Sequence, residues 1–404
     1  MENQTPFLAS VGILLIVASL IAIATRRLGM PYSVGLVAAG LGIAIIPGTP
    51  QFPLSRELIF NVLLPPLVFE AALQLEWKRF RRELPLTLTL AGAGVALGSV
   101  VVAAGMHFLV GWSWLGSAMF AVLIAATDPV AVIAAFKEMK AEPRLSMVVE
   151  SESLLNDGVV AVAFAVLLSI AAGSSTGIGE IAFISLWSLG GGVIVGAAVG
   201  GAVLLVAGRT NDHLVEVTLT AIAAYGSFLV AEHLNGSGIL ASLTAGLLIG
   251  NLGWMGAISD QGRPHVISAW EFFAFLANSV VFLLIGVHEA SQPVAELGLQ
   301  PEMIAIVLVL LGRLVAVYPL SFLFRRTKLR LPAGYQHVLF WGGLRGALAL
   351  ALALTIPDSV PERYPIIVMA FVVVAFSIFV QGLTMPVLVR KLGLVAEGRQ
   401  PSDS

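Results

Sequence analysis

The 404-residue sequence contains no cysteine and few charged residues. Without cysteine the chain can form neither a disulfide nor a thiolate metal site, and it has no cysteine nucleophile. Charged residues make up 11% of the chain, and the formal net charge of -2 provides no basic surface for nucleic acid. These absences exclude disulfide scaffolds, thiol-dependent enzymes and nucleic-acid-binding proteins.

The residues that are present are mostly apolar. Hydrophobic residues make up 58% of the chain and the mean hydropathy is +0.95, well above the range of soluble domains. A helix needs about 20 apolar residues to cross a bilayer. We therefore predict an all-α polytopic membrane protein with thirteen transmembrane helices, which cover Phe7 to Thr25, Pro31 to Ile46, Leu58 to Leu75, Leu84 to Val110, Gly116 to Phe136, Leu145 to Ala171, Ile181 to Ala207, Leu214 to Ala231, Gly238 to Leu252, Val266 to Val287, Ile304 to Phe324, Tyr335 to Ile356 and Ile366 to Val389.

The basic residues orient these spans, because cytoplasmic loops carry an excess of Lys and Arg. Alternate connections and the C-terminal tail hold 18 of the 22 basic residues, namely Arg26, Arg27, Lys78, Arg79, Arg81, Arg82, Lys137, Lys140, Arg144, Arg209, Arg263, Arg325, Arg326, Lys328, Arg330, Arg390, Lys391 and Arg399. The opposite connections hold only Arg56 and Arg363. This bias predicts a multi-pass protein of the cell (inner or plasma) membrane, with its N-terminus outside and its C-terminus in the cytoplasm.

Several charged residues fall deep inside predicted spans, among them Asp128, Asp157, Arg313 and Arg345. Asp128 and Asp157 each lie roughly 18 Å along their helices, and because neighbouring spans are antiparallel both reach the bilayer midplane. An ionised group there costs at least a few kcal/mol unless it meets water, a cation or a partner, so it is a functional candidate. A structural ion pair or a neutral carboxylic acid is the alternative interpretation.

The segment "ESESLLNDGVV" adds further oxygen atoms to this region. Glu152 and Asn156 are one helical turn apart, as are Ser153 and Asp157, so neighbouring stripes of one helix present acids, an amide and a hydroxyl. Hard monovalent cations prefer oxygen ligands, and the sequence has no cluster of His or Cys for a transition metal. Glu150, two residues from Glu152, is expected to point away from the cluster as a surface charge.

The segment "AATDPVAV" predicts a broken helix at the same depth. Pro129 has no N–H to donate to the preceding turn, so the backbone around Thr127 and Asp128 is expected to unwind and free its carbonyls. Broken helices at the midplane hold ions in many secondary transporters, although a proline kink can also be purely structural.

A second interruption is predicted in "WGGLRGALAL", where Gly342, Gly343 and Gly346 surround Arg345. The fifth and twelfth spans lie seven apart and are therefore antiparallel. This spacing predicts two six-helix inverted repeats, spans one to six and eight to thirteen, whose broken helices cross.

Four motifs together resemble a known family: "PPLVFEAAL", "ATDPVAV", "ESESLLNDGVV" and "GGLRGAL". In this order, and with this number of helices, they resemble the monovalent cation/proton antiporters of the sodium/hydrogen exchanger type, in the electroneutral branch that includes prokaryotic NhaP proteins. The resemblance implies a homodimer with an elevator mechanism. It divides the chain into an N-terminal portion of the dimerisation domain (1–83), an N-terminal portion of the transport domain (84–172), a linking helix with the rest of the dimerisation domain (173–300), the rest of the transport domain (301–389) and a short cytoplasmic tail (390–404).

The resemblance also implies residue roles. Asp157 would bind either the cation or the proton, and Asp128, Ser153 and Thr127 would complete the Na⁺ site. The supporting residues would be Asn156, Glu152, Arg313, Arg345 and Glu70. Among these, Glu152 would pair with Arg313, and Glu70 would lie near the entrance. Arg345 would compensate the negative C-terminal ends of the broken helices, as helix-dipole physics independently favours.

The expected function is therefore exchange of Na⁺, or Li⁺ or K⁺, for H⁺. A one-for-one electroneutral exchange is expected because Asn156, which replaces the second aspartate of electrogenic relatives, cannot titrate. We expect no enzymatic activity and no cofactor beyond the transported Na⁺ and H⁺; the expected partners are the lipid bilayer and a second copy of the chain. An uncoupled cation channel is the alternative. An intramembrane hydrolase fits poorly, because no nucleophile and base pair accompanies the acids.

Overall fold

The computed structural model describes residues 4–28, 30–45, 55, 57–173, 177–289 and 298–395. Throughout these residues the chain is helical between its connecting segments, and it contains no strand beyond one isolated bridge between Ala141 and Val395. Three residues named in the sequence predictions, Ile46, Arg56 and Arg399, lie outside the described residues, as does most of the predicted tail.

The helices follow the predicted apolar ranges. The N-terminal half contains α1 (Gln4–Leu28), α2 (Tyr32–Ala44), η1 (Leu58–Leu63), α3 (Leu64–Gln74), α4 (Trp77–Gly105), η2 (Met106–Val110), α5 (Trp114–Leu123), α6 (Val130–Met139), α7 (Pro143–Ala171) and α8 (Ile178–Ala207). The C-terminal half contains α9 (His213–His233), α10 (Gly238–Leu252), η3 (Gly253–Met255), α11 (Gly262–Glu289), α13 (Leu299–Leu323), α14 (Ala333–Trp341), α15 (Ala347–Leu354), α16 (Arg363–Phe376), η4 (Ser377–Gly382) and α17 (Leu383–Lys391).

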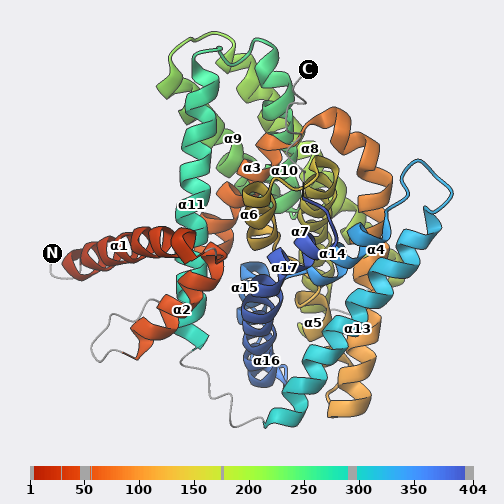
Figure 1. Cartoon of the computed structure of the whole chain (residues 1–404). Coiled ribbons are helices and arrows are strands. Elements are labelled where there is room, and N and C mark those ends of the chain that lie inside the picture. Colours follow the sequence, from red (N-terminus) through yellow and green to blue (C-terminus); the bar gives the residue numbers. More distant parts are fainter. Residues whose placement is uncertain are drawn as a thin grey trace, which may run out of the picture.

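Within the described residues, eight helices are long and apolar enough to cross a membrane. The remaining predicted spans correspond to shorter helices, to the two broken helices and to α1, so a total of thirteen crossings stays a prediction. The α1 helix projects sideways from the other helices (Figure 1). Its exposed apolar side chains, such as Ile16 and Leu20, would face lipid or another protein.

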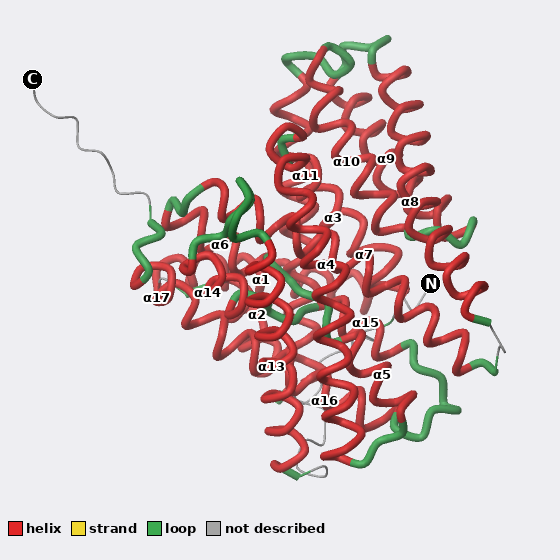
Figure 2. The backbone as a smooth tube through the Cα atoms, turned by 90° about the vertical axis from the view of Figure 1, so that its right-hand side faces the viewer, coloured by secondary structure: helices red, strands yellow, loops and turns green. Residues whose placement is uncertain are grey.

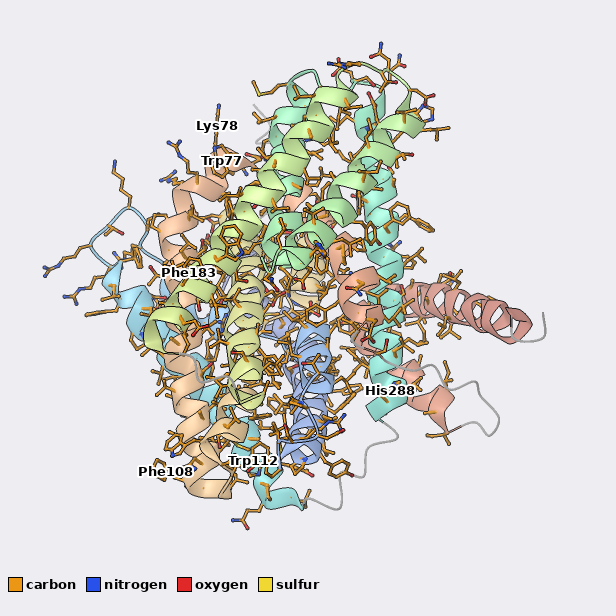
Figure 3. The ribbon with its side chains drawn as sticks, turned by 180° about the vertical axis from the view of Figure 1, so that it is seen from behind. Trp77, Lys78, Phe108, Trp112, Phe183 and His288 are labelled. Carbon is orange, nitrogen blue, oxygen red and sulfur yellow. The ribbon has the colours of Figure 1, made fainter. Side chains whose placement is uncertain are left out.

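The helix formed by α4 and η2 has the length and the terminal residues of a membrane span. Its 34 residues extend roughly 50 Å at 1.5 Å per residue, more than the hydrocarbon thickness of about 30 Å. Trp77 and Lys78 lie at one end of this helix, and Phe108 and Trp112 lie at the other (Figure 3). Aromatic and basic side chains favour the membrane–water boundary, so these residues mark both ends of a span.

The helices pack in two groups. One group contains α2, α3, α8, α9, α10 and α11, and the other contains α4, α5, α6, α13, α14, α15, α16 and α17. The α7 helix packs on α4 and α5 of the second group and also contacts α8 and α10 of the first. Figure 2 shows α8, α9, α10 and α11 gathered on one side and α6, α14 and α17 on the other. Glycine permits the closest approaches: a Cβ atom at Gly312 of α13 would lie 2.9 Å from the carbonyl oxygen of Gly98 of α4.

Two helices are interrupted in the centre of the molecule. The first break separates α5 from α6, and the second separates α14 from α15. The two extended segments cross, and the backbone N–H of Asp128 donates a hydrogen bond of 2.8 Å to the carbonyl of Leu344. Proline removes a backbone donor in one break, and glycine disfavours the helical conformation in the other, so this contact replaces some of the backbone hydrogen bonds that the helices lose.

Candidate functional site

Asp128 lies where the two breaks meet. One carboxylate oxygen, Oδ1, accepts a hydrogen bond of 2.9 Å from the backbone N–H of Val130, in the first turn of α6. The other oxygen, Oδ2, lies against Gly346, where any Cβ atom would collide with the carboxylate. Asp128 is therefore held next to the N-terminal ends of α6 and α15, whose positive partial charges favour an anionic group.

Side chains from α7 bind the first break directly. The hydroxyls of Thr127 and Ser153 lie 3.0 Å apart, and Ser153 also donates to the Thr127 carbonyl. The amide of Asn156 donates to the Ala125 carbonyl and to the Thr127 hydroxyl, both at 3.0 Å. The structure thus brings together Thr127, Ser153 and Asn156, which the sequence analysis selected from two separate motifs.

Asp157 has a carboxylate oxygen that is available for a ligand. Its Oδ1 atom is buried and has no hydrogen-bond partner among the described residues. Asp157, Asp128 and Thr127 line the same cavity of about 430 Å³, between α3, α6, α7, α11 and α15. A buried carboxylate is costly unless a proton, a cation or a donor compensates it, so this oxygen requires a partner during function.

Further acids line the cavity, and the sequence analysis placed one of them, Glu150, elsewhere. Glu70 of α3 lines it, and so does Glu150 of α7. The prediction that Glu150 points away from the site is therefore wrong. Glu150, Leu154 and Asp157 follow each other at intervals of four and three residues, so they share one helical stripe, and all three face the cavity.

Glu152 lies on the opposite stripe and forms a buried ion pair. Two nitrogens of Arg313 contact its two carboxylate oxygens at 2.7 and 3.0 Å, and both side chains are less than 10% exposed. This pair was expected from the family resemblance. Arg313 also donates twice to the carbonyl of Leu339, at 3.1 and 3.0 Å, so it satisfies the C-terminal end of α14 as well.

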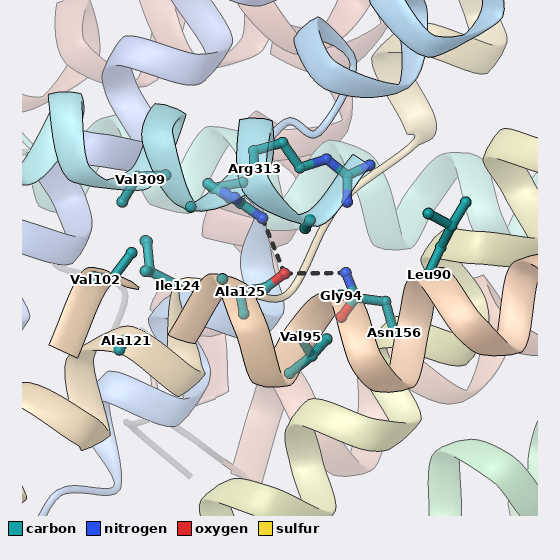
Figure 4. A pocket seen from close by; sticks show the side chains of 14 residues that line it. Leu90, Gly94, Val95, Val102, Ala121, Ile124, Ala125, Asn156, Val309 and Arg313 are labelled. Carbon is teal, nitrogen blue, oxygen red and sulfur yellow. Dashed lines mark hydrogen bonds between the residues drawn. The ribbon is translucent and has the colours of Figure 1, made fainter. Parts of the chain in front are cut away.

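Arg345 binds the end of the other broken helix. Its guanidinium donates to the carbonyls of Ala125 and Ala126, at 2.9 and 3.2 Å, just beyond the end of α5. Figure 4 shows the Ala125 carbonyl receiving one bond from an arginine and one from Asn156, beside a cavity of about 30 Å³. One arginine therefore faces the negative end of each interrupted helix.

Two supporting residues were missed from the sequence. The Ser377 hydroxyl, in η4, accepts a hydrogen bond of 3.0 Å from the backbone N–H of Arg345. The side-chain amide of Gln381 donates to the Trp341 carbonyl at 3.1 Å. Both brace the second break. The signal was available, because Ser377 and Gln381 are polar, one helical turn apart, and embedded in an apolar run.

The arrangement fits a monovalent cation. It offers two carboxylates together with neutral hydroxyl and carbonyl oxygens at the end of a cavity, which is a hard-oxygen ligand set. No group of three or more His, Cys, Asp or Glu side chains suited to a metal ion occurs in the portion of the chain that the structure describes. The site therefore has the composition of a cation site built from oxygen ligands.

Comparisons with known proteins agree with this chemistry. The Na⁺/H⁺ antiporter ApNhaP of Aphanothece halophytica is 38% identical over 403 residues, which cover 99% of this chain and 77% of that protein. The low-affinity Na⁺/H⁺ antiporter NhaS1 of Synechocystis sp. is 36% identical, covering 99% of this chain and 76% of that protein. The sodium proton antiporter MjNhaP1 of Methanocaldococcus jannaschii has a similar fold, with a TM-score of 0.74 at 19% identity over 98% of this chain and 100% of that one.

These relatives are antiporters, which agrees with the expectation that this chain is not an enzyme, and none of them supports the channel alternative. Together with the eight long apolar helices, they identify a multi-pass protein of the cell membrane. The family model described as sodium/hydrogen exchanger, transmembrane, matches residues 13–391. The chain therefore belongs to the transmembrane sodium/hydrogen exchanger family.

Proposed function

We propose that this protein exchanges one Na⁺, or a related monovalent cation such as Li⁺ or K⁺, for one H⁺, and that both ions compete for Asp157. The observation that carries the proposal is the unpaired Oδ1 atom of Asp157, buried at the end of the 430 Å³ cavity. A proton on this carboxylate or a cation beside it would each neutralise the buried charge. Simultaneous occupancy is unfavourable, which couples the two fluxes.

The remaining ligands follow from the geometry around Asp157. Asp128 supplies a second carboxylate, fixed by its bond to Val130. Ser153 and Thr127 supply neutral oxygens, which bond each other in this structure and would reorient toward a cation. Each cation contact would then replace a hydrogen bond that already exists within the protein, so the net affinity for the cation stays moderate. A transporter must release its ion and therefore requires such moderate affinity.

Electroneutrality rests on Asn156. Its amide is held between the Ala125 carbonyl and the Thr127 hydroxyl, and it carries no charge in either state. Glu152 is neutralised by Arg313, and Asp128 is kept anionic by the Val130 N–H and the N-terminal ends of α6 and α15. This leaves Asp157 as the group that alternates between one proton and one cation. The loaded site then has the same charge in both directions, so a membrane potential has no net charge movement to drive.

Movement of one helix group against the other would provide alternating access. The cavity is lined by α3 and α11 on one side and by α6, α7 and α15 on the other, so sliding between these groups would open and close it. We propose an elevator mechanism in a homodimer, with thirteen crossings, two inverted repeats, the N-terminus outside and the C-terminus in the cytoplasm.

The test is cation-dependent proton flux in proteoliposomes. Addition of Na⁺ to acid-loaded vesicles should cause proton efflux, and Asp157→Asn should abolish it while leaving the protein folded. The matched control is Asp260→Asn, an exposed aspartate in the loop before α11, which should keep normal flux. Normal exchange by Asp157→Asn would refute the role of this carboxylate.

Stoichiometry is tested separately by imposing a potassium diffusion potential. At opposing Na⁺ and H⁺ gradients, the point where the flux reverses should not shift with the potential. A shift would mean that net charge moves, and the one-for-one proposal would then be wrong although exchange itself remained.

A further inference from the structure

A second cavity lies between the two helix groups, next to the ion cavity, with which it shares Arg26, Lys137 and Phe275. Its volume is about 830 Å³. One wall comes from α1, α2 and α11, and the other comes from α6 and α17. Ligand sites typically measure roughly 300 to 1,000 Å³, so this space could hold a small molecule or a section of a lipid.

The charges that line this cavity have one sign. Arg26, Lys137 and Arg390 face it from three different helices, and its described lining contains no acidic residue. All three are exposed, and none forms an ion pair within the described residues. Arg26 and Lys137 also line the ion cavity, where Glu70 and Glu150 are near them, but no acidic residue of this second cavity's described lining accompanies Arg390. An anion between the three cations would reduce their mutual repulsion and would therefore be stabilised.

Each of these cations lies in the last turn of its helix, where basic side chains often bind the free carbonyls. Such bonds to helix carbonyls occupy few of the donors of these three residues. Arg390 donates only through Nε, to the carbonyl of Pro386 at 3.2 Å, and neither Arg26 nor Lys137 makes a side-chain hydrogen bond in the described structure. Most of their donors therefore remain free for a ligand.

Apart from Thr25, the rest of the lining is apolar or aromatic, including Met30, Met139 and Phe275. Arg26, Lys137 and Arg390 also belong to the set of basic residues that the sequence assigns to the cytoplasmic side. A cavity with cations at the membrane boundary and apolar side chains beside them has the chemistry that binds phospholipid headgroups between transmembrane helices.

We propose that this cavity binds a phosphate-bearing anion, supplied in the membrane by the headgroup of an anionic phospholipid. Arg26 contributes from the group of α2 and α11, whereas Lys137 and Arg390 contribute from the opposite wall. Because the phosphate would bridge both walls, the bound lipid would favour the arrangement of the two helix groups seen here over others. This proposal stands independently of the ion-binding roles above.

The test is titration of the detergent-solubilised protein with short-chain lipids, with bound copies counted by native mass spectrometry. Dihexanoyl phosphatidylglycerol should bind at least tenfold more tightly than dihexanoyl phosphatidylcholine, which has a phosphate but no net charge. Arg26→Gln and Arg390→Gln should each weaken phosphatidylglycerol binding roughly fivefold, the effect expected for one basic residue near an anionic headgroup. Arg390→Lys should keep most of the affinity, because it keeps the charge.

The matched control is Arg326→Gln, an exposed arginine in the loop between α13 and α14 that lines neither cavity. This variant should bind phosphatidylglycerol like the unmodified protein. Adding inorganic phosphate distinguishes the two possible sources of the anion. If phosphate displaces phosphatidylglycerol, the site also accepts free phosphate; if it does not, the site is specific for the lipid. Equal affinity for the two lipids, or equal weakening by Arg326→Gln, would overturn the proposal.

Discussion

The hydroxyl of Ser153 is one of the smallest groups in the proposed ion site. It contacts both the hydroxyl and the carbonyl of Thr127, so it holds the first break in place and provides a neutral oxygen near Asp157. Alanine at this position would remove one ligand without adding or removing charge. The effect should therefore fall on cation affinity more than on folding.

We expect Ser153→Ala to raise the KM for Na⁺ roughly fivefold to tenfold, with a smaller change in maximal rate. The loss corresponds to about 1 to 1.5 kcal/mol, the usual contribution of one hydrogen-bonding group. The matched control is Ser151→Ala, also buried on α7, whose hydroxyl contacts only the sulfur of Met147 at 3.5 Å. Equal KM changes in both variants would show that the effect is not local to the ion site.

The ion pair between Glu152 and Arg313 should be important for stability. Arg313→Ala leaves a buried carboxylate uncompensated and should lower the free energy of unfolding by roughly 3 to 5 kcal/mol, measured by denaturant unfolding in detergent. Adding Glu152→Gln should recover some of this loss. Recovery should be incomplete, because the carbonyl of Leu339 also loses its donor.

An exposed pair provides the control for this measurement. Arg79 and Glu76 lie 2.9 Å apart, but both side chains are about 60% exposed, so Arg79→Ala should cost no more than about 1 kcal/mol. If the double variant at Glu152 and Arg313 were no more stable than Arg313→Ala alone, the two side chains would not stabilise each other.

The two broken helices form one unit rather than two separate defects. Each break ends a helix whose carbonyls need donors, and Arg313, Arg345 and Gln381 supply them from outside the helix. The positive ends of α6 and α15 remain near Asp128. The breaks therefore place partial positive charge, from the N-terminal ends of α6 and α15, next to the carboxylate of Asp128. They place partial negative charge, from the C-terminal ends of α5 and α14, next to the arginines.

Gly346 provides a test of this unit. In Gly346→Ala the added methyl group would collide with the carboxylate of Asp128 and displace it from the end of α6. We expect exchange to fall at least tenfold while the helical content stays unchanged, measured by proton flux and circular dichroism. Gly92→Ala in α4 is the control, since its methyl group meets no described atom within 4 Å. Normal flux in Gly346→Ala would mean that the position of Asp128 matters little.

At the scale of the whole molecule, the ion cavity lies between the two helix groups. Acids from both sides line it, including Glu70 of α3, Glu150 of α7 and Glu271 of α11. Arg26 and Lys137 lie there too, and both belong to the predicted cytoplasmic set. The cavity in this structure is therefore expected to open toward the cytoplasm.

The absence of cysteine makes the predicted topology directly testable, because single cysteines can be introduced without a background. Thr327→Cys, in the exposed loop between α13 and α14, should react with a membrane-impermeant maleimide only from the cytoplasmic side. Ser359→Cys, in the exposed loop between α15 and α16, should react only from the outside. Labelling of both from the same side would contradict the predicted orientation and the number of crossings between them.

The sequence by itself determined the membrane class, the helical ranges and both breaks. These properties are local: a run of apolar residues must form a helix in lipid, and Pro129 or a glycine cluster interrupts it wherever the fold places it. The motifs, through the family resemblance, also predicted that Asp157, Asp128, Ser153, Thr127 and Asn156 form one site. Periodicity placed Ser153, Asn156 and Asp157 within about one turn of each other, whereas only the family resemblance joined them to Thr127 and Asp128.

Only the tertiary structure decided which face of each helix meets which partner. It turned Glu150 toward the cavity, brought Ser377 and Gln381 to the second break, and placed Arg26, Lys137 and Arg390 around one space. Hydrophobic patterning could not have specified these contacts. In lipid both faces of a helix are apolar, so the usual difference between buried and exposed positions is weak, and close packing and hydrogen bonding set the rotation of each helix.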